Sequence, residues 1–151
     1  MDGVDAVARV TEGAAIERVG GCCCGTVRYV VVGDPQRVTR CHCRHCRRTS
    51  GAPFVTWAQF DKATYRVTAG EAAIHEYESR SRVTRTFCFK CGTLLTYRNS
   101  DESEILDNTA ISLDANDDLE VEDHVWCARM VPWLTMNDRL LRYSRGRDDA
   151  A

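Results

Sequence analysis

Long apolar segments are missing from this chain of 151 residues. No run approaches the roughly 18 consecutive apolar residues of a membrane span. The first residues also lack the basic and apolar segments of a secretory signal. An excess of positive charge is missing too, since the formal net charge is -2, which argues against nucleic-acid binding. We therefore expect a cytoplasmic protein with no membrane partner and no nucleic-acid partner.

Helical periodicity and internal repeats are also scarce. Short segments rich in β-branched and aromatic residues recur instead, with turn signals between them. These predicted strands are residues 26–32, 54–60, 64–68, 73–78, 93–97, 108–113 and 124–127. Only residues 44–49 resemble a brief helical turn. The pattern predicts one mostly β domain over residues 15–143, with a flexible N-terminus (1–14) and a flexible C-terminal tail (144–151).

Cysteine, by contrast, is abundant: the chain has nine, and eight of them fall into three tight clusters. Disulfides rarely persist in a reducing compartment, so dense cysteines there indicate metal binding or catalysis. The odd count also fits a complete disulfide framework poorly. We therefore interpret the clusters as metal sites.

Two of the clusters together supply one closed ligand set. Cys22 and Cys24 are two residues apart, so an extended backbone points both thiols to the same face. Cys88 and Cys91 have the C-x2-C spacing of a zinc knuckle. Four thiolates close a tetrahedral site, which favours a structural zinc ion that ties an early strand to a late one. Cys23 points the other way and is a spare thiol.

The third cluster, Cys41, Cys43 and Cys46, offers only three thiolates. Three protein ligands with a fourth position free for substrate are typical of a catalytic zinc. Three thiolates overcompensate the charge of a divalent ion, so a soft fourth ligand such as a substrate thiol suits this site best. A thiol held in this way is a nucleophile at neutral pH, because the thiolate is the reactive form.

Two alternatives remain open at the third cluster. His42, His45 or the distant Cys127 would complete a second closed structural site, although an extended backbone turns His42 away from its neighbours. A group of arginines surrounds the cluster: Arg40, Arg44, Arg47 and Arg48. They form either a solvated basic turn or a site that offsets the thiolate charge and binds a substrate carboxylate, with Arg47 or Arg48 as the candidates.

Six motifs together resemble the glutathione-dependent formaldehyde-activating enzyme family, which includes a centromere-protein-V-like branch. Three of them hold the cysteines: Gly-Cys-x-Cys-Gly-x-Val-x-Tyr at 21–29, Cys-His-Cys-x-x-Cys-Arg-Arg-x-Ser-Gly at 41–51, and Phe-Cys-x-x-Cys-Gly-Thr-Leu-Leu at 87–95. The others are Ser-Leu-Asp at 112–114, His-Val-Trp at 124–126 and Pro-Trp at 132–133. The resemblance runs in the order of the family from about residue 20 to residue 133.

The resemblance implies a β-tent fold of coiled β-sheets with two zinc ions per chain. It assigns Cys22, Cys24, Cys88 and Cys91 to the structural zinc, and Cys41, Cys43 and Cys46 to the catalytic zinc. The activity it implies is that of a carbon-sulfur lyase, which condenses formaldehyde with glutathione to S-hydroxymethylglutathione. The expected partner is thus a small-molecule thiol, glutathione or a similar compound.

Two further hypotheses belong to other functional classes. A zinc-stabilised binding module of the centromere-protein-V-like branch would have both metal sites closed and would contact a partner through its arginine-rich turn. A redox sensor would use Cys23 or Cys127 and would need an exposed thiol of low pKa.

Overall fold

The computed structural model describes residues 15–149, which form eleven strands and one α-helix. The predicted N-terminal segment 1–14 lies outside the described residues. The strands are β1 (Glu17–Gly21), β2 (Arg28–Val32), β3 (Arg37–Cys41), β4 (Val55–Asp61), β5 (Tyr65–Ala69), β6 (Ile74–Arg80), β7 (Val83–Cys88), β8 (Leu94–Asn99), β9 (Ile105–Thr109), β10 (Asp123–Val125) and β11 (Leu141–Arg142). The helix is α1 (Arg44–Ser50). The 3-10 turns are η1 (Lys62–Thr64), η2 (Glu71–Ala73), η3 (Ser100–Glu102), η4 (Ala110–Ser112) and η5 (Cys127–Arg129).

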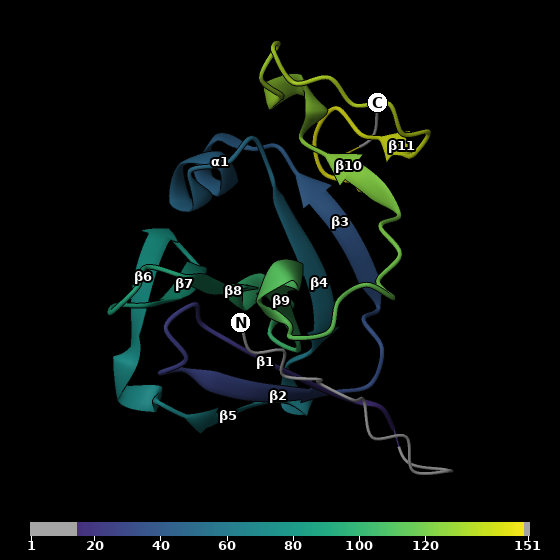
Figure 1. The fold of residues 1–151 in the computed structure, drawn as a ribbon. Helices are drawn as coiled ribbons and strands as arrows, with labels where there is room; N and C mark the ends of the chain where they lie inside the picture. The colour runs from purple at the N-terminus through teal and green to yellow at the C-terminus, as the bar shows by residue number, and fades with distance from the viewer. Residues whose placement is uncertain (1–14, 150–151) are drawn as a thin grey trace, which may run out of the picture.

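The strands form two sheets (Figure 1). The small sheet has the order β1-β2-β5 and is antiparallel throughout. The large sheet has the order β11-β10-β3-β4-β9-β8-β7-β6, in which β10 pairs in parallel with both β3 and β11. The predicted mostly β architecture is therefore confirmed.

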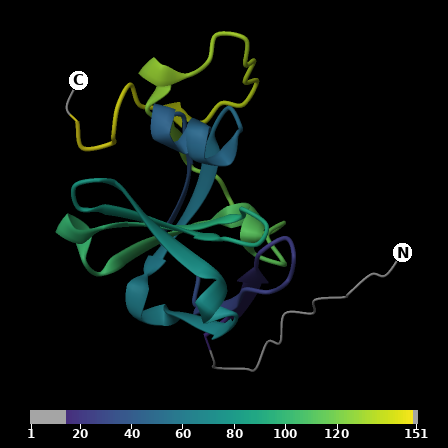
Figure 2. The same cartoon turned by 90° about the vertical axis from the view of Figure 1, so that its left-hand side faces the viewer.

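The two faces of the large sheet have different neighbours, as strand β4 illustrates. Ala58 and Phe60 point from one face into the main core, where they meet Tyr29 and Val31 of the small sheet. Trp57 points from the opposite face into a smaller core beneath α1. This alternation follows from the two-residue period of a strand. Figure 2 shows the result: α1 lies on one side of the central strands and the small sheet on the other.

The strand predicted at 108–113 differs in its bounds. β9 begins earlier, at Ile105, and ends at Thr109, after which the chain turns through η4. The hydroxyl of Ser112 donates to the carbonyl oxygen of Thr109 at 2.8 Å. Such a local bond gives the backbone an alternative to the strand ladder.

Residues 144–149, predicted as part of a flexible tail, return to the large sheet. The backbone N–H groups of Trp126 and Ala128 donate to the carbonyl oxygens of Arg145 and Ser144. Arg147 pairs with the buried carboxylate of Asp123 on β10. These partners are far away in sequence, so polarity alone did not reveal them. Within residues 15–149 no helix is long and apolar enough to cross a membrane.

Candidate metal centres and their cavities

The four-cysteine cluster joins the two sheets. Cys22 and Cys24 lie in the loop between β1 and β2, whereas Cys88 ends β7 and Cys91 lies in the turn between β7 and β8. All four Sγ atoms lie within 4.8 Å of one another. Cys23 is exposed and stands outside this group.

Hydroxyl groups support thiolates in this cluster. The Oγ1 atoms of Thr26 and Thr93 lie 3.3 and 3.2 Å from the Sγ atoms of Cys24 and Cys91. The hydrogen bond with Thr93 lowers the pKa of the Cys91 thiol to about 5, and the hydrogen bond with Thr26 lowers the pKa of the Cys24 thiol. Metal ligands must be deprotonated, so these threonines favour the form that binds a metal.

The sulfur positions fit a tetrahedral ion. Zinc–thiolate bonds of about 2.3 Å in tetrahedral geometry place neighbouring sulfurs roughly 3.8 Å apart. The Sγ of Cys24 lies 3.5 Å from that of Cys22 and 3.9 Å from that of Cys88. The Sγ atoms of this cluster are therefore already at distances that suit a tetrahedral metal ion.

The three-cysteine cluster is built at the junction of β3 and α1. Cys41 ends β3, Cys43 is the N-cap of α1, and Cys46 lies in its first turn, where it is 2 % exposed. Their Sγ atoms also lie within 4.8 Å of one another. The Sγ of Cys43 accepts the backbone N–H of Cys46 at 3.4 Å, so the capping bond of the helix also fixes the metal-binding geometry.

No fourth histidine, cysteine or carboxylate among residues 15–149 joins this cluster. His42 faces away: its Nε2 lies 2.8 Å from Nδ1 of His124, whose Nε2 contacts the carboxylate of Asp138 at 3.1 Å. His45 and Cys127 are also outside the group. The arrangement is therefore one of three protein ligands, and the second closed site considered from the sequence does not form in this structure.

A cavity of about 490 Å³ adjoins the three-cysteine cluster. Its floor is the α1-facing side of the large sheet, where strand register aligns side chains in one row. Arg37 pairs with Gln59, Gln59 with Asp107, Asp107 with Tyr97, and Tyr97 with Arg85. Side chains paired across neighbouring strands share a face. Each of these five residues lines the cavity.

Cys46 has two polar neighbours from the sheet. Nε1 of Trp57 donates to its Sγ at 3.4 Å, and Nη2 of Arg85 lies 3.6 Å from the same atom. The pKa of the Cys43 thiol is lowered, first by a hydrogen bond with Cys41 and in part by the charge of Arg85. Hydrogen bonds with Cys43 and burial raise the pKa of the Cys41 and Cys46 thiols. The positive charge of Arg85 acts in the opposite direction at Cys43 and Cys46 and so favours the thiolate form that a metal site requires.

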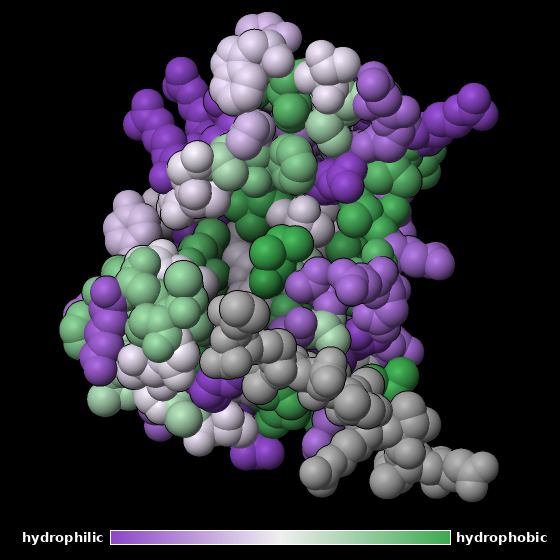
Figure 3. Space-filling model, in the orientation of Figure 1, coloured by the Kyte–Doolittle hydropathy of each residue, from purple (hydrophilic) through white to green (hydrophobic). Residues whose placement is uncertain are grey.

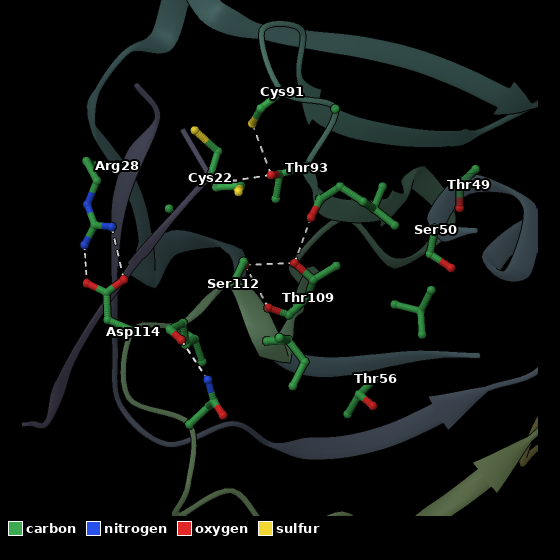
Figure 4. A pocket seen from close by; sticks show the side chains of 18 of the residues that line it. Cys22, Arg28, Thr49, Ser50, Thr56, Cys91, Thr93, Thr109, Ser112 and Asp114 are labelled. Carbon is green, nitrogen blue, oxygen red and sulfur yellow. Dashed lines mark hydrogen bonds and ion pairs between the residues drawn. The ribbon is translucent and has the colours of Figure 1, made fainter. Parts of the chain in front are cut away.

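A second cavity, of about 780 Å³, lies beside the four-cysteine cluster (Figure 4). Cys22 and Cys91 stand at one end and Thr49 and Ser50, from the end of α1, at the other. A bidentate ion pair between Arg28 and Asp114 closes one side. Figure 3 shows this face of the molecule hollowed near its centre, with apolar side chains around the hollow.

The arginines considered from the sequence have different places. Arg40 pairs with Asp138 at 2.8 Å. Nε of Arg47 donates to the carbonyl oxygen of His42 at 3.2 Å. Neither Arg47 nor Arg48 lines the cavity beside the three-cysteine cluster, whereas Arg44 does. The carboxylate-binding role weighed for Arg47 or Arg48 therefore has no support in this geometry.

The sequence did not single out Trp57, Arg85, Tyr97 or Asp107. Each belongs to a strand, and only the pairing register places them over one cavity. The available signal was a charged residue within a short β-rich segment, as at Arg85 and Asp107. That signal predicts a solvent-facing side chain, whereas Arg85 is buried, and it does not predict a shared cavity.

Comparison with known families gives an independent result. A family model described as glutathione-dependent formaldehyde-activating enzyme matches residues 17–129, well over half of the chain. The chain belongs to this family. The resemblance inferred from the sequence motifs is thus confirmed. The matched range of this formaldehyde-activating enzyme family member contains both the four-cysteine and the three-cysteine cluster. The match ends before residues 146–148, which also line the cavity beside the three-cysteine cluster.

Individual relatives agree with the family assignment. An uncharacterized lyase of Schizosaccharomyces pombe is 30% identical over 81 residues, which is 54% of this chain and 57% of that protein. The chain thus matches little more than half the length of this curated relative. A crystal structure of a Rhodobacter sphaeroides protein superposes with a TM-score of 0.57 at 22% identity, over 68% of this chain and 96% of the other. This likeness concerns the fold.

Proposed function

We propose that this protein is a zinc-dependent carbon-sulfur lyase that acts on the adduct of a small thiol and an aldehyde. Glutathione with formaldehyde, giving S-hydroxymethylglutathione, is the pair that family membership suggests first. The observation that carries the proposal is the three-cysteine cluster, which has no fourth protein ligand among residues 15–149 and adjoins a cavity of about 490 Å³. Cavities of this size accommodate small-molecule ligands.

The two cysteine clusters would have different roles, one catalytic and one structural. Cys41, Cys43 and Cys46 would hold the catalytic zinc, and Cys22, Cys24, Cys88 and Cys91 the structural zinc. A zinc ion held by three thiolates supplies a site where a substrate sulfur is stabilised as a thiolate. We also propose a cytoplasmic location, because a reducing compartment keeps such thiols free for metal.

The reaction needs no further reactant. In the direction of adduct formation the substrate sulfur attacks the aldehyde carbon, so a carbon–sulfur bond forms and the carbonyl π bond breaks. The electron pair moves to the oxygen, which takes up the proton that the thiol released. The residues next to the cluster would orient the two reactants, and the rings of Trp57 and Tyr97, 5.9 Å apart, would limit the access of water to it.

The test separates the two cysteine clusters by metal content and thiol binding. We expect Cys43→Ser to stay folded, to lose about one metal ion per chain and to lose glutathione binding measured by calorimetry. Cys88→Ser is expected to lose metal and to destabilise the fold, because structural zinc binding is coupled to folding. Cys127→Ser, outside both clusters, is the matched control and is expected to keep both ions.

Turnover is measured with formaldehyde and several thiols. Wild-type protein that holds two metal ions but neither binds a thiol nor forms an adduct would refute the lyase proposal. That result would favour a zinc-stabilised binding module of the centromere-protein-V-like branch.

A further inference from the structure

Arg85 has too few partners for a buried charged side chain. It is 3 % exposed, yet its Nε and Nη1 atoms have no hydrogen-bond partner in the part of the chain that the structure describes. Its one polar contact is the Sγ of Cys46, 3.6 Å from Nη2. No carboxylate is paired with it among residues 15–149. Burying a guanidinium without hydrogen bonds is costly, so the arrangement points to a missing acceptor.

Aromatic rings fix the guanidinium in this position. Its Cζ lies 5.0 Å from the ring centroid of Tyr97 and 5.7 Å from that of Trp57. Both rings line the same cavity as the three-cysteine cluster. Cation–π contacts hold the group in place but accept no N–H hydrogen bonds in the guanidinium plane. The unpartnered N–H groups therefore belong to a residue that lines this cavity and contacts Cys46.

We propose that Arg85 binds an oxygen atom that the ligand carries close to its sulfur. This inference rests on the proposed function, in which the ligand sulfur lies at the three-cysteine cluster. An oxygen two or three bonds from that sulfur then lies within the reach of the free N–H groups of Arg85. The planar fork of a guanidinium is well suited to such an oxygen, and a carboxylate can accept two bonds from it.

The assignment gives Arg85 a role in the chemistry. In an S-hydroxymethyl adduct the oxygen is two bonds from the sulfur, and negative charge grows on it while the carbon–sulfur bond forms. A fixed donor aimed at developing charge accelerates such a step, commonly by about a hundredfold or more. Arg85 thereby becomes a candidate catalytic residue outside the cysteine motifs.

A purely structural role is the competing explanation. Arg85 would then only balance the negative charge of three thiolates around a divalent ion. In that case its loss would weaken metal binding but would not alter the choice between ligands that share a thiol. The two roles are therefore separable by ligand selectivity.

The experiment compares mercaptoacetate with its methyl ester by isothermal calorimetry on protein loaded with zinc. The two probes share the thiol and the two carbons that connect it to the carboxyl oxygens, and only the acid carries a negative oxygen three bonds from the sulfur. We expect wild-type protein to prefer the acid at least about tenfold, and Arg85→Gln to reduce this ratio to about threefold or less. Arg37→Gln, which removes an exposed arginine from the same cavity, is expected to keep the tenfold ratio.

If Arg85→Gln does not fold or does not hold metal, Arg85→Lys replaces it in the experiment. The lysine variant keeps the positive charge and loses the planar guanidinium fork. A ratio in the Arg85 variant that stays within about twofold of wild type overturns the proposal. Turnover with formaldehyde is scored separately. Turnover without a preference for the acid rejects the role of Arg85 alone, whereas the preference without turnover rejects the lyase and keeps the oxygen-binding site.

Discussion

Asp107 shows how the fold changes the chemistry of a single residue. It lies on β9 at the floor of the cavity beside the three-cysteine cluster. Burial raises the pKa of its carboxyl group to about 7, with a smaller contribution from Glu102. A hydrogen bond from Gln59 and the charges of Arg37 and Arg85 act in the opposite direction and do not cancel the effect of burial. Asp107 therefore titrates near neutral pH.

This shift predicts a pH dependence of stability. The pKa in the folded state lies above the value of about 3.9 expected in the unfolded chain. Between these two values the folded state binds more protons, so the contribution of Asp107 to stability falls as pH rises from about 4 to about 7. We expect Asp107→Asn to flatten this fall, by about 1 kcal/mol or more between pH 5 and pH 8, in urea unfolding of the metal-loaded protein.

The exposed Asp117 provides the control for Asp107. Asp117→Asn is expected to leave the pH profile of the wild type unchanged. Parallel profiles for wild type and Asp107→Asn would contradict the assigned pKa.

At the scale of elements, α1 controls the geometry of the three-cysteine cluster although it has only seven residues. It begins at the Cys43 cap and ends at Gly51, whose φ is 65°. An added Cβ at Gly51 would meet nothing within 4 Å, so only the backbone opposes a larger residue there. We expect Gly51→Ala to destabilise the fold by about 1 kcal/mol. It should also weaken metal binding at the three-cysteine cluster, because the last turn of the helix is loosened.

Gly33 offers a matched comparison for Gly51. Its φ is 96°, and an added Cβ there also meets nothing within 4 Å, but it lies in the turn after β2. Gly33→Ala should lower the unfolding free energy by a similar amount without changing metal affinity. Chelator competition measures that affinity, and equal affinity losses in both variants would disprove a specific role of α1.

Sequence reasoning reached some elements and missed others for physical reasons. The strands at β2, β4, β5 and β8 were predicted within about two residues, because β-branched and aromatic residues alternate there. β3 and β7 were missed, since Arg37 and Thr39 of β3 and Arg85 of β7 face the cavity and interrupt the apolar pattern. The two cysteine pairs and the cysteine triplet could be predicted from the sequence, because their members are only two or three residues apart. The row of side chains that runs across the strands from Arg37 to Arg85 could not be predicted, because it depends on the register between strands that are distant in sequence.

At the scale of the whole molecule, the four-cysteine cluster brings together residues from both sheets. Cys22 and Cys24 come from a loop of the small sheet, and Cys88 and Cys91 come from the end of β7 and the turn after it in the large sheet. The sheets also share a core that includes Tyr29 and Phe60. A bound metal would add a fixed connection at one edge of that core, so its removal should loosen the small sheet first.

Hydrogen–deuterium exchange tests this order. In Cys24→Ser, amides of β1, β2 and β5 are expected to exchange at least about tenfold faster than in wild type, while those of β3 and β4 change less. The large sheet keeps its own ladder and the second cysteine cluster, so its protection depends less on the missing ligand. Cys23→Ser is the adjacent control, because Cys23 is exposed and outside the cluster, and it should exchange like wild type. Equal acceleration in both sheets would mean that the molecule opens as one unit and that the cluster stabilises the fold globally instead of joining two separable parts.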